Sequence, residues 1–147
     1  AWDRGQIDEG LRILDTALAL RAPGPYQLQA AIAACHASAA DAAQTDWVEI
    51  AELYRQLTRI TPSPVVELNR AVAVAMADGP AAGLALVDAL CASGELAGYH
   101  LLPATRADLL RRLGRDTEAA QAYRAALELV GSDAERRYLS RRLAELG

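Results

Sequence analysis

The 147-residue chain has no phenylalanine and no lysine, and only 5% of its residues are aromatic. Few large rings are therefore available to fill a core, and alanine, which is abundant, must occupy much of it. Alanine is the strongest helix former, and its small side chain lets helices approach closely. The composition therefore favours a protein built of helix packed on helix. Its reliance on arginine alone for long basic side chains also suggests a gene of high GC content.

Cysteine and histidine are scarce, which limits the chemistry available to the chain. Cys35 and Cys91 lack CxxC spacing, so we expect small buried thiols in a reducing cytoplasm. His36 and His100 match no metal motif such as HExxH. No GxSxG nucleophile turn or phosphate-binding glycine loop occurs either. We therefore expect a non-catalytic protein without a metal or a cofactor.

Positive charge is sparse over most of the chain. Residues 1–105 carry 6 arginines against 12 acids, residues 106–147 carry 9 against 7, and the net charge is −4. Affinity for nucleic acid depends on clustered cations, so we do not expect this chain to bind DNA by itself. With no leader and no apolar run of membrane-spanning length, we expect a soluble, cytoplasmic protein with no membrane contact. The 52% hydrophobic fraction suits one folded domain over residues 1–147.

The chain also repeats itself. Four leucines each follow a large residue four places earlier, at intervals of 39, 33 and 37 residues: Leu18, Leu57, Leu90 and Leu127. Such a period is typical of stacked helix pairs, which generally form binding surfaces. Three copies also share small residues where a second helix would approach: Gly10 with Ala17, Ala82 with Ala89, and Ala119 with Ala126. We predict an all-α superhelix of helical hairpins.

Breaks in the apolar periodicity predict about eight helices. Pro25, Pro64 and Pro80 suit first helical turns, where the missing N–H of proline would be unpaired anyway. Asp46 is a predicted N-cap, and Gly114 a predicted left-handed helix end. The expected ranges are about 6–20, 25–39, 64–77, 80–92, 100–113 and 116–130, with further helices between Asp46 and Thr61 and from Ser132, a capping-box residue with Glu135, to near Leu146.

Residues 113–127, LGRDTEAAQAYRAAL, resemble the second half of a tetratricopeptide repeat, with Gly114 at the turn and Ala119, Tyr123 and Ala126 at the packing points. Ala107 and Leu110 fill packing positions of the first half. Nearly the whole chain, in order, resembles the C-terminal extension of bacterial extracytoplasmic-function RNA polymerase sigma factors that carry tetratricopeptide-like repeats. The resemblance is carried by WDR at 2–4, Ile7, Glu9, Gly10, GPYQLQAAIAACHA at 24–37, TDW at 45–47, LNRAVAV at 68–74, GP at 79–80, RA at 106–107, Leu109 and Leu110.

The resemblance implies a regulatory domain that contacts the sigma regions of its own longer chain or the RNA polymerase core. It would meet promoter DNA only through those upstream regions. A small-molecule sensor and a stand-alone tetratricopeptide-like scaffold are the alternative functions. The first predicted helix has no partner before it, and such a helix can pair two copies of the fragment as a homodimer.

Two polar groups are candidate protein-binding sites. Asn69 and Arg70 lie in an otherwise apolar helix, so they would either contact a partner protein or form an inter-helix hydrogen bond, with Glu67 or Asp88 as the nearby partner. The last helix carries a basic stripe that suits an acidic surface, or else forms a solvated cap: Arg136, Arg137, Arg141 and Arg142.

A third candidate is a polar and aromatic ligand groove, consisting of Tyr26, Gln29, His36, Trp47 and Tyr54. Aromatic anchors with a few fixed polar groups are typical of recognition sites. The alternative is structural: Tyr26 and Trp47 would pack between repeats, and His36 would be hydrogen-bonded within the fold.

Overall fold

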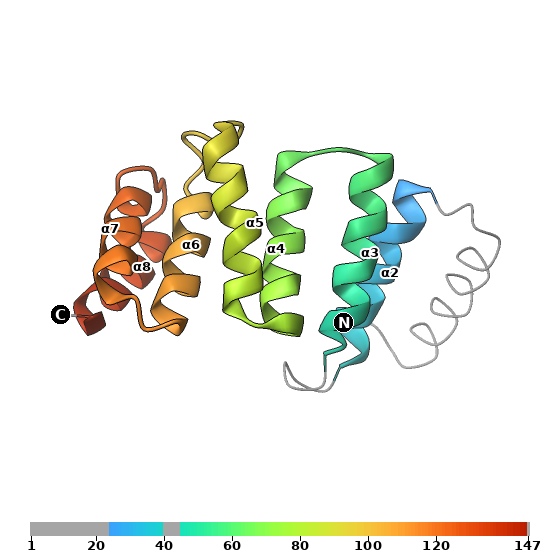
Figure 1. Cartoon of the computed structure of the whole chain (residues 1–147), viewed down its shortest axis with the longest axis horizontal. Helices are drawn as coiled ribbons and strands as arrows, with labels where there is room; N and C mark the ends of the chain where they lie inside the picture. Colours follow the sequence, from blue (N-terminus) through green and yellow to red (C-terminus); the bar gives the residue numbers. More distant parts are fainter. Residues whose placement is uncertain (1–23, 40–44, 147) are drawn as a thin grey trace. The chain divides into compact units, whose positions relative to one another are not determined.

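The computed structural model describes residues 24–39 and 45–146, and every regular element within them is an α-helix (Figure 1). The helices are α2 (Pro25–Ser38), α3 (Trp47–Ile60), α4 (Pro64–Asp78), α5 (Pro80–Ser93), α6 (Leu101–Arg112), α7 (Asp116–Leu127) and α8 (Asp133–Leu146). The predicted all-α class is confirmed for this part of the chain. The helix expected over residues 6–20, which would bring the number to about eight, lies outside the described residues.

The helices begin where the sequence predicts. Pro25, Pro64 and Pro80 each open a helix. The Asp46 carboxylate accepts a hydrogen bond from the N–H of Glu49 at 3.0 Å, which confirms the predicted N-cap of α3. Because the first helical N–H groups have no partner within the helix, these residues define its start.

The helix ends are also set locally. Gly114 has a φ of +76°, and the N–H of Arg115 donates to the carbonyl of Leu110 at 2.9 Å, which confirms the left-handed end of α6. By contrast, α7 ends at Leu127 and not at residue 130. The N–H of Val130 still bonds to the carbonyl of Ala126, so the chain makes one more turn without continuing the helix.

The described part of the chain divides into two compact units, one up to residue 73 and the other from residue 74, with the boundary inside α4. In the first unit α2 packs on α3, and residues of α4 join their core. The buried members of this core are Leu28, Ala31, Ile32, Ala34, Ile50, Leu53, Leu57 and Ala73. Ile50, Leu53 and Leu57, spaced three and four residues apart, supply the buried face of α3.

In the second unit each helix packs on the next: α5 on α6, α6 on α7, and α7 on α8. The contact between α6 and α7 is the most extensive. Five fully buried residues form its centre: Ala107, Leu110, Ala119, Tyr123 and Ala126. Burial expected at these packing positions is confirmed, and the three alanines explain how the two helices approach so closely.

The positions of the leucine repeat are buried only in part. Leu90 is buried, whereas Leu127 is partly buried and Ala126 takes the buried position beside it. The expectation that Ala89 lies at a helix contact was wrong, because Ala89 is exposed. The buried face of α5 consists of Gly83, Leu84, Val87 and Leu90. This face is displaced by one residue, about 100° around the helix axis, from the face expected. The first copy of the repeat, residues 10–18, lies outside the described residues.

Candidate functional site

The predicted ligand groove is brought together only in part. His36, near the end of α2, lies edge-on to Trp47 at the start of α3, with ring centroids 5.4 Å apart and planes at 75°. Tyr26 lies in the first turn of α2, about 15 Å along the helix axis from His36, and is 82% exposed. Gln29 is also exposed. The structural alternative was therefore wrong for Tyr26, and a site here would consist of His36 and Trp47 without it.

Trp47 and Tyr54 pack against the core of the first unit. Burial raises the pKa of the Tyr54 hydroxyl, so this group stays protonated. The indole Nε1 of Trp47 is buried and has no hydrogen-bond partner within residues 24–39 and 45–146. A buried N–H without a partner costs about 1–3 kcal/mol, so this donor is the group at this position that an acceptor on a ligand would satisfy.

The two thiols lie in different environments. Cys35 is partly buried, and burial, with the carboxylates of Glu49 and Asp46, raises its pKa to about 11. Cys91 is exposed, so the expectation of a buried thiol was wrong there. The physical reason is its place in the last turn of α5, one turn after the buried Val87, where Cys91 adjoins a hollow and not a packed side chain.

Asn69 and Arg70 are neighbours on α4 with different surroundings. Asn69 is exposed, so water can satisfy its amide. Arg70 Nη1 donates to Glu67 Oε1 at 2.7 Å one turn earlier on the same helix. Glu67 was one of the two partners expected, but the expectation of a bond between helices was wrong, because this one lies within α4. The other, Asp88, instead accepts from Arg106 Nε at 2.9 Å.

The basic stripe of α8 is mostly open to solvent. Its exposed members are Arg136, Arg137 and Arg141. Arg142 is partly buried and donates to Glu145 at 3.1 Å. The guanidinium carbons of Arg141 and Arg142 lie 5.7 and 5.5 Å from the ring centre of Tyr138, within cation–π range. Tyr138 and then Glu145 raise the pKa of Arg142. Arg142 thus stabilises α8, and the exposed three remain available to a partner.

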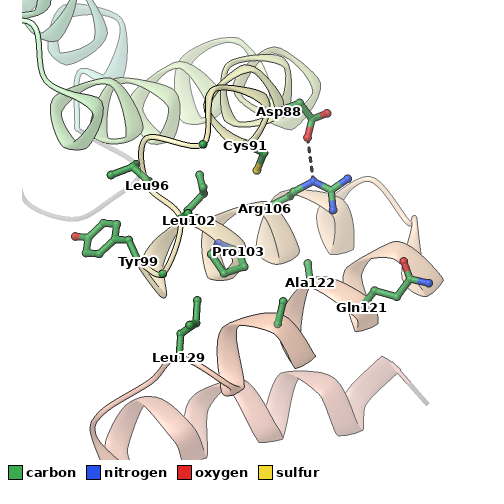
Figure 2. Close-up of a pocket in the computed structure, with 14 residues that line it drawn as sticks. Asp88, Cys91, Leu96, Tyr99, Leu102, Pro103, Arg106, Gln121, Ala122 and Leu129 are labelled. Carbon is green, nitrogen blue, oxygen red and sulfur yellow. Dashed lines mark hydrogen bonds and ion pairs between the residues drawn. The ribbon is translucent and has the colours of Figure 1, made fainter.

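A hollow that the sequence did not predict lies among α5, the loop after it, α6 and α7 (Figure 2). Its volume of about 560 Å³ is in the range of small-molecule sites. Four lining residues share one face of α6 and the turn before it, at positions 99, 102, 103 and 106. Figure 2 shows Leu96, Tyr99 and Leu129 at one end of the hollow, and Asp88, Arg106 and Gln121 at the other.

Four alternating charges connect the helices at the polar end of this hollow. Besides its bond to Asp88, Arg106 places Nη2 3.9 Å from Glu118 Oε2, which is too long for a hydrogen bond. Glu118 accepts two hydrogen bonds from Arg115, at 2.9 and 2.7 Å. This pairing lowers the pKa of Glu118 and raises that of Arg115. The Nη groups of Arg106 therefore have no hydrogen-bond partner within the described part of the chain.

A second hollow, of about 420 Å³, separates α6 from α8. At one end His100 Nε2 pairs with Glu135 Oε2. The N–H of Glu135 also donates to the Ser132 hydroxyl at 3.2 Å, which confirms Ser132 as the cap of α8, although the Glu135 side chain reaches His100. Further along, Asp108 and Tyr138 line the hollow.

Asp108 is the centre of a hydrogen-bond cluster that joins three helices. The hydroxyl of Tyr123 on α7 donates to Asp108 Oδ1 at 2.5 Å and accepts from Arg111 Nε at 3.1 Å. The hydroxyl of Tyr138 on α8 lies 3.1 and 3.3 Å from the two carboxylate oxygens. Burial, and then the hydrogen bond to Asp108, raise the pKa of Tyr123. We interpret this cluster as a structural connection of α6, α7 and α8.

Sequence reasoning missed both hollows because each depends on residues brought together from different helices. The signal that could have indicated them is the polar spacing on α6, where Arg106 and Asp108 interrupt an apolar helix on different faces. Among the described residues, no group of three or more His, Cys, Asp or Glu side chains is placed to hold a metal ion. Within the same residues, no helix combines the length and the hydropathy needed to cross a membrane.

Comparison with known proteins finds a bacterial relative. The chain is 49% identical over 146 residues to an uncharacterized protein of Rhizobium meliloti (strain 1021). The match covers 99% of this chain and 34% of that protein, so the chain spans about a third of its relative's length. No protein-family model matches the chain, and no solved structure does. The resemblance to sigma-factor extensions therefore stays a prediction.

Proposed function

We propose that this chain is a non-catalytic regulatory domain of a bacterial extracytoplasmic-function sigma factor, a tetratricopeptide-like superhelix that acts in the cytoplasm by binding protein. The observation that carries the proposal is the ordered resemblance from Trp2 to Leu110. The positions of α2 to α8, which follow the predicted helices to within about one turn, are compatible with it. The comparison with the relative is also compatible with the proposal, because this chain spans only 34% of that protein's length.

The proposed partner is the sigma portion of the longer chain or the polymerase core, and promoter DNA is reached only through that sigma portion. Arg136, Arg137 and Arg141 are exposed on one helix, and arginine forks pair well with carboxylates. The acidic partner surface would be steered toward them. Asn69 is a second contact on α4, with Arg70 beside it. Binding would shift the promoter-binding regions between a competent and a restrained arrangement.

Calorimetry of the 147-residue chain against the separately produced sigma regions, and against core polymerase, tests the proposal. A variant with Arg136, Arg137 and Arg141 changed to Glu should bind at least about tenfold more weakly, equivalent to about 1.4 kcal/mol. The matched control changes Arg59, Arg112 and Arg124, which are also exposed arginines, to Glu. It alters net charge similarly and should leave the affinity within about twofold.

A second variant, Asn69→Ala with Arg70→Ala, tests the α4 surface separately. Its effect on folding should be small, because the pair that it removes is a partly exposed contact one turn apart on the same helix. Light scattering on each sample measures self-association, since a homodimer of the fragment would compete with the partner. Absence of saturable binding to both partners would overturn the proposed function.

A small-molecule sensor at His36 and Trp47 is the second candidate, and the unpaired Trp47 Nε1 is the observation that favours it. A ligand that accepts this hydrogen bond would stabilise the folded state by mass action. A thermal-shift screen with Trp47→Phe as the comparison tests it. Stabilisation that survives this substitution would place the ligand elsewhere.

A further inference from the structure

We propose that the hollow bounded by α5, α6 and α7 is a binding site for a small organic carboxylate with an apolar body. The inference rests on the second unit alone, and it does not depend on the sigma-factor proposal. It combines a preformed volume of about 560 Å³ with a lining that is apolar at one end and polar at the other (Figure 2). Such polarity within one hollow selects amphipathic ligands.

The apolar end would receive the body of the ligand. Leu96 and Leu102 are buried and form fixed walls, whereas Leu129 is 42% exposed at the opening. An exposed leucine beside a hollow has apolar surface still to bury, and removing that surface from water favours binding. Tyr99 adds a flat ring at the same end.

The polar end would receive the carboxylate. Asp88 accepts from Arg106 Nε and thereby holds the guanidinium in one orientation. The Arg106 side chain is 29% exposed, and its Nη donors have no hydrogen-bond partner among the residues that the structure describes. A planar pair of N–H donors matches the two oxygens of a carboxylate. Gln121 of α7 lines the same end and can contribute an amide donor.

The charges around the hollow favour an anionic ligand over a cationic one. Both acids nearby are already paired: Asp88 with Arg106, and Glu118 with the two donors of Arg115. The unsatisfied groups are the N–H donors of Arg106. An ammonium ligand could share Asp88 through its second oxygen as a single point contact, whereas a carboxylate can accept two parallel hydrogen bonds from the Nη donors of Arg106.

The experiment uses three probes of nearly equal shape: phenylbutyrate, phenylbutyramide and phenylbutylamine. Cys91 lines the hollow and is exposed, so its alkylation by neutral iodoacetamide reports occupancy. Mass spectrometry of tryptic peptides reads Cys91 and Cys35 separately, and Cys35 is the internal control for general effects on the reagent. We expect phenylbutyrate to slow Cys91 alkylation saturably, with half-protection at a concentration at least about tenfold below that of the amide or the amine.

Variants separate the charge from the shape. Arg106→Gln should raise the half-protection concentration of phenylbutyrate about tenfold and leave that of the amide nearly unchanged. Arg115→Gln is the matched control, because Arg115 belongs to the same charge cluster but does not line the hollow. Asp88→Asn removes a negative charge from the rim, so it should strengthen phenylbutyrate binding and weaken phenylbutylamine binding. Each comparison is made with and without probe on the same variant, with circular dichroism to establish folding.

Three results would overturn the inference: no protection of Cys91 by phenylbutyrate up to its solubility limit, equal protection by all three probes, or an Arg106→Gln effect no larger than that of Arg115→Gln. If Arg106→Gln fails to fold, Asp88→Asn provides the test. This variant should lower the half-protection concentration of phenylbutyrate and raise that of phenylbutylamine.

Discussion

Tyr123→Phe and Asp108→Ala, made singly and together, should be strongly coupled in their effect on folding. Tyr123 is fully buried, and its hydroxyl donates to the Asp108 carboxylate at 2.5 Å. A hydrogen bond to a charged group contributes about 1.5–3 kcal/mol, so Tyr123→Phe alone should lower the free energy of unfolding by about 2 kcal/mol. Asp108 keeps Tyr138 as a partner in that variant, so no buried charge is left alone.

The effect of Tyr123→Phe on the free energy of unfolding should almost disappear when Asp108 is absent. In the Asp108→Ala variant the Tyr123 hydroxyl has lost its acceptor but remains buried, which costs about 1–3 kcal/mol. Replacing Tyr123 by Phe then removes the unsatisfied O–H donor and loses only the bond from Arg111, whose side chain is partly exposed to water. The second substitution should therefore cost less than about 0.5 kcal/mol or stabilise the protein. The resulting coupling free energy is about 2 kcal/mol, within the range for residues in direct contact.

Urea unfolding followed by circular dichroism measures the four free energies, and hydrogen exchange of α7 peptides places the loss in the second unit. Tyr138→Phe is the control: its hydroxyl makes longer contacts, 3.1 and 3.3 Å, at a partly exposed position, so it should cost less than about 1 kcal/mol. Additivity of Tyr123→Phe and Asp108→Ala to within about 0.5 kcal/mol would refute the reasoning.

Other substitutions and reactivities follow from the local geometry. Gly114→Ala should lower the free energy of unfolding by about 1–2 kcal/mol, because an L side chain is strained at φ +76°; urea unfolding measures this, and no loss would contradict the left-handed assignment. Asp46→Ala should cost about 1 kcal/mol in the same assay, and Asp46→Asn, which retains a capping oxygen, should cost much less. At pH 8 iodoacetamide should alkylate Cys91 much faster than Cys35, whose pKa of about 11 leaves little thiolate until the pH approaches that value; equal rates would contradict the burial of Cys35. Partial burial and Asp88 raise the pKa of Cys91, while Arg106 lowers it. Asp88→Asn should therefore lower this pKa and speed alkylation at fixed pH, and a slower reaction would contradict the assigned effect of Asp88 on the thiol.

Helix boundaries were predictable because each is decided within a few residues. A proline at Pro64 or Pro80 allows a helix to begin but not to continue through it, and the caps at Asp46 and Ser132 satisfy N–H groups three residues away. The end of α7 was less predictable, because the sequence there stays compatible with a helix to residue 130, and only the loop to α8 interrupts it.

Which face of a helix is buried was harder to predict, because it depends on the partner. In α5 the residues Ala82, Leu86 and Ala89 look like a copy of the packing face of α7, yet Gly83 and Val87 are buried in their place. A shift of one residue preserves the apolar spacing, so periodicity alone does not distinguish the two faces.

The candidate sites were less predictable still. Glu67 was foreseen as a partner of Arg70, but in a bond between helices, whereas the pair lies one turn apart on α4. The pairs of Asp88 with Arg106 and of Asp108 with Tyr138, which do join different helices, were not predicted. The exposure of Tyr26 follows from its place at the start of α2, a property of packing that residue type does not reveal.

Two residues on α6, Arg106 and Asp108, belong to different clusters. A separation of two residues turns them about 200° apart around the helix, so Arg106 reaches α5 while Asp108 reaches α7 and α8. Asp108→Ala should therefore lower the unfolding free energy, while Arg106→Gln, which breaks a partly exposed ion pair, should change it by less than about 1 kcal/mol. If Asp108→Ala also shifts the phenylbutyrate concentration that protects Cys91, then the docking of α8 and the shape of the hollow are linked through α6. A partner bound to the arginines of α8 would then change the affinity of the hollow for its ligand, and by reciprocity the ligand would change the affinity for that partner by the same factor.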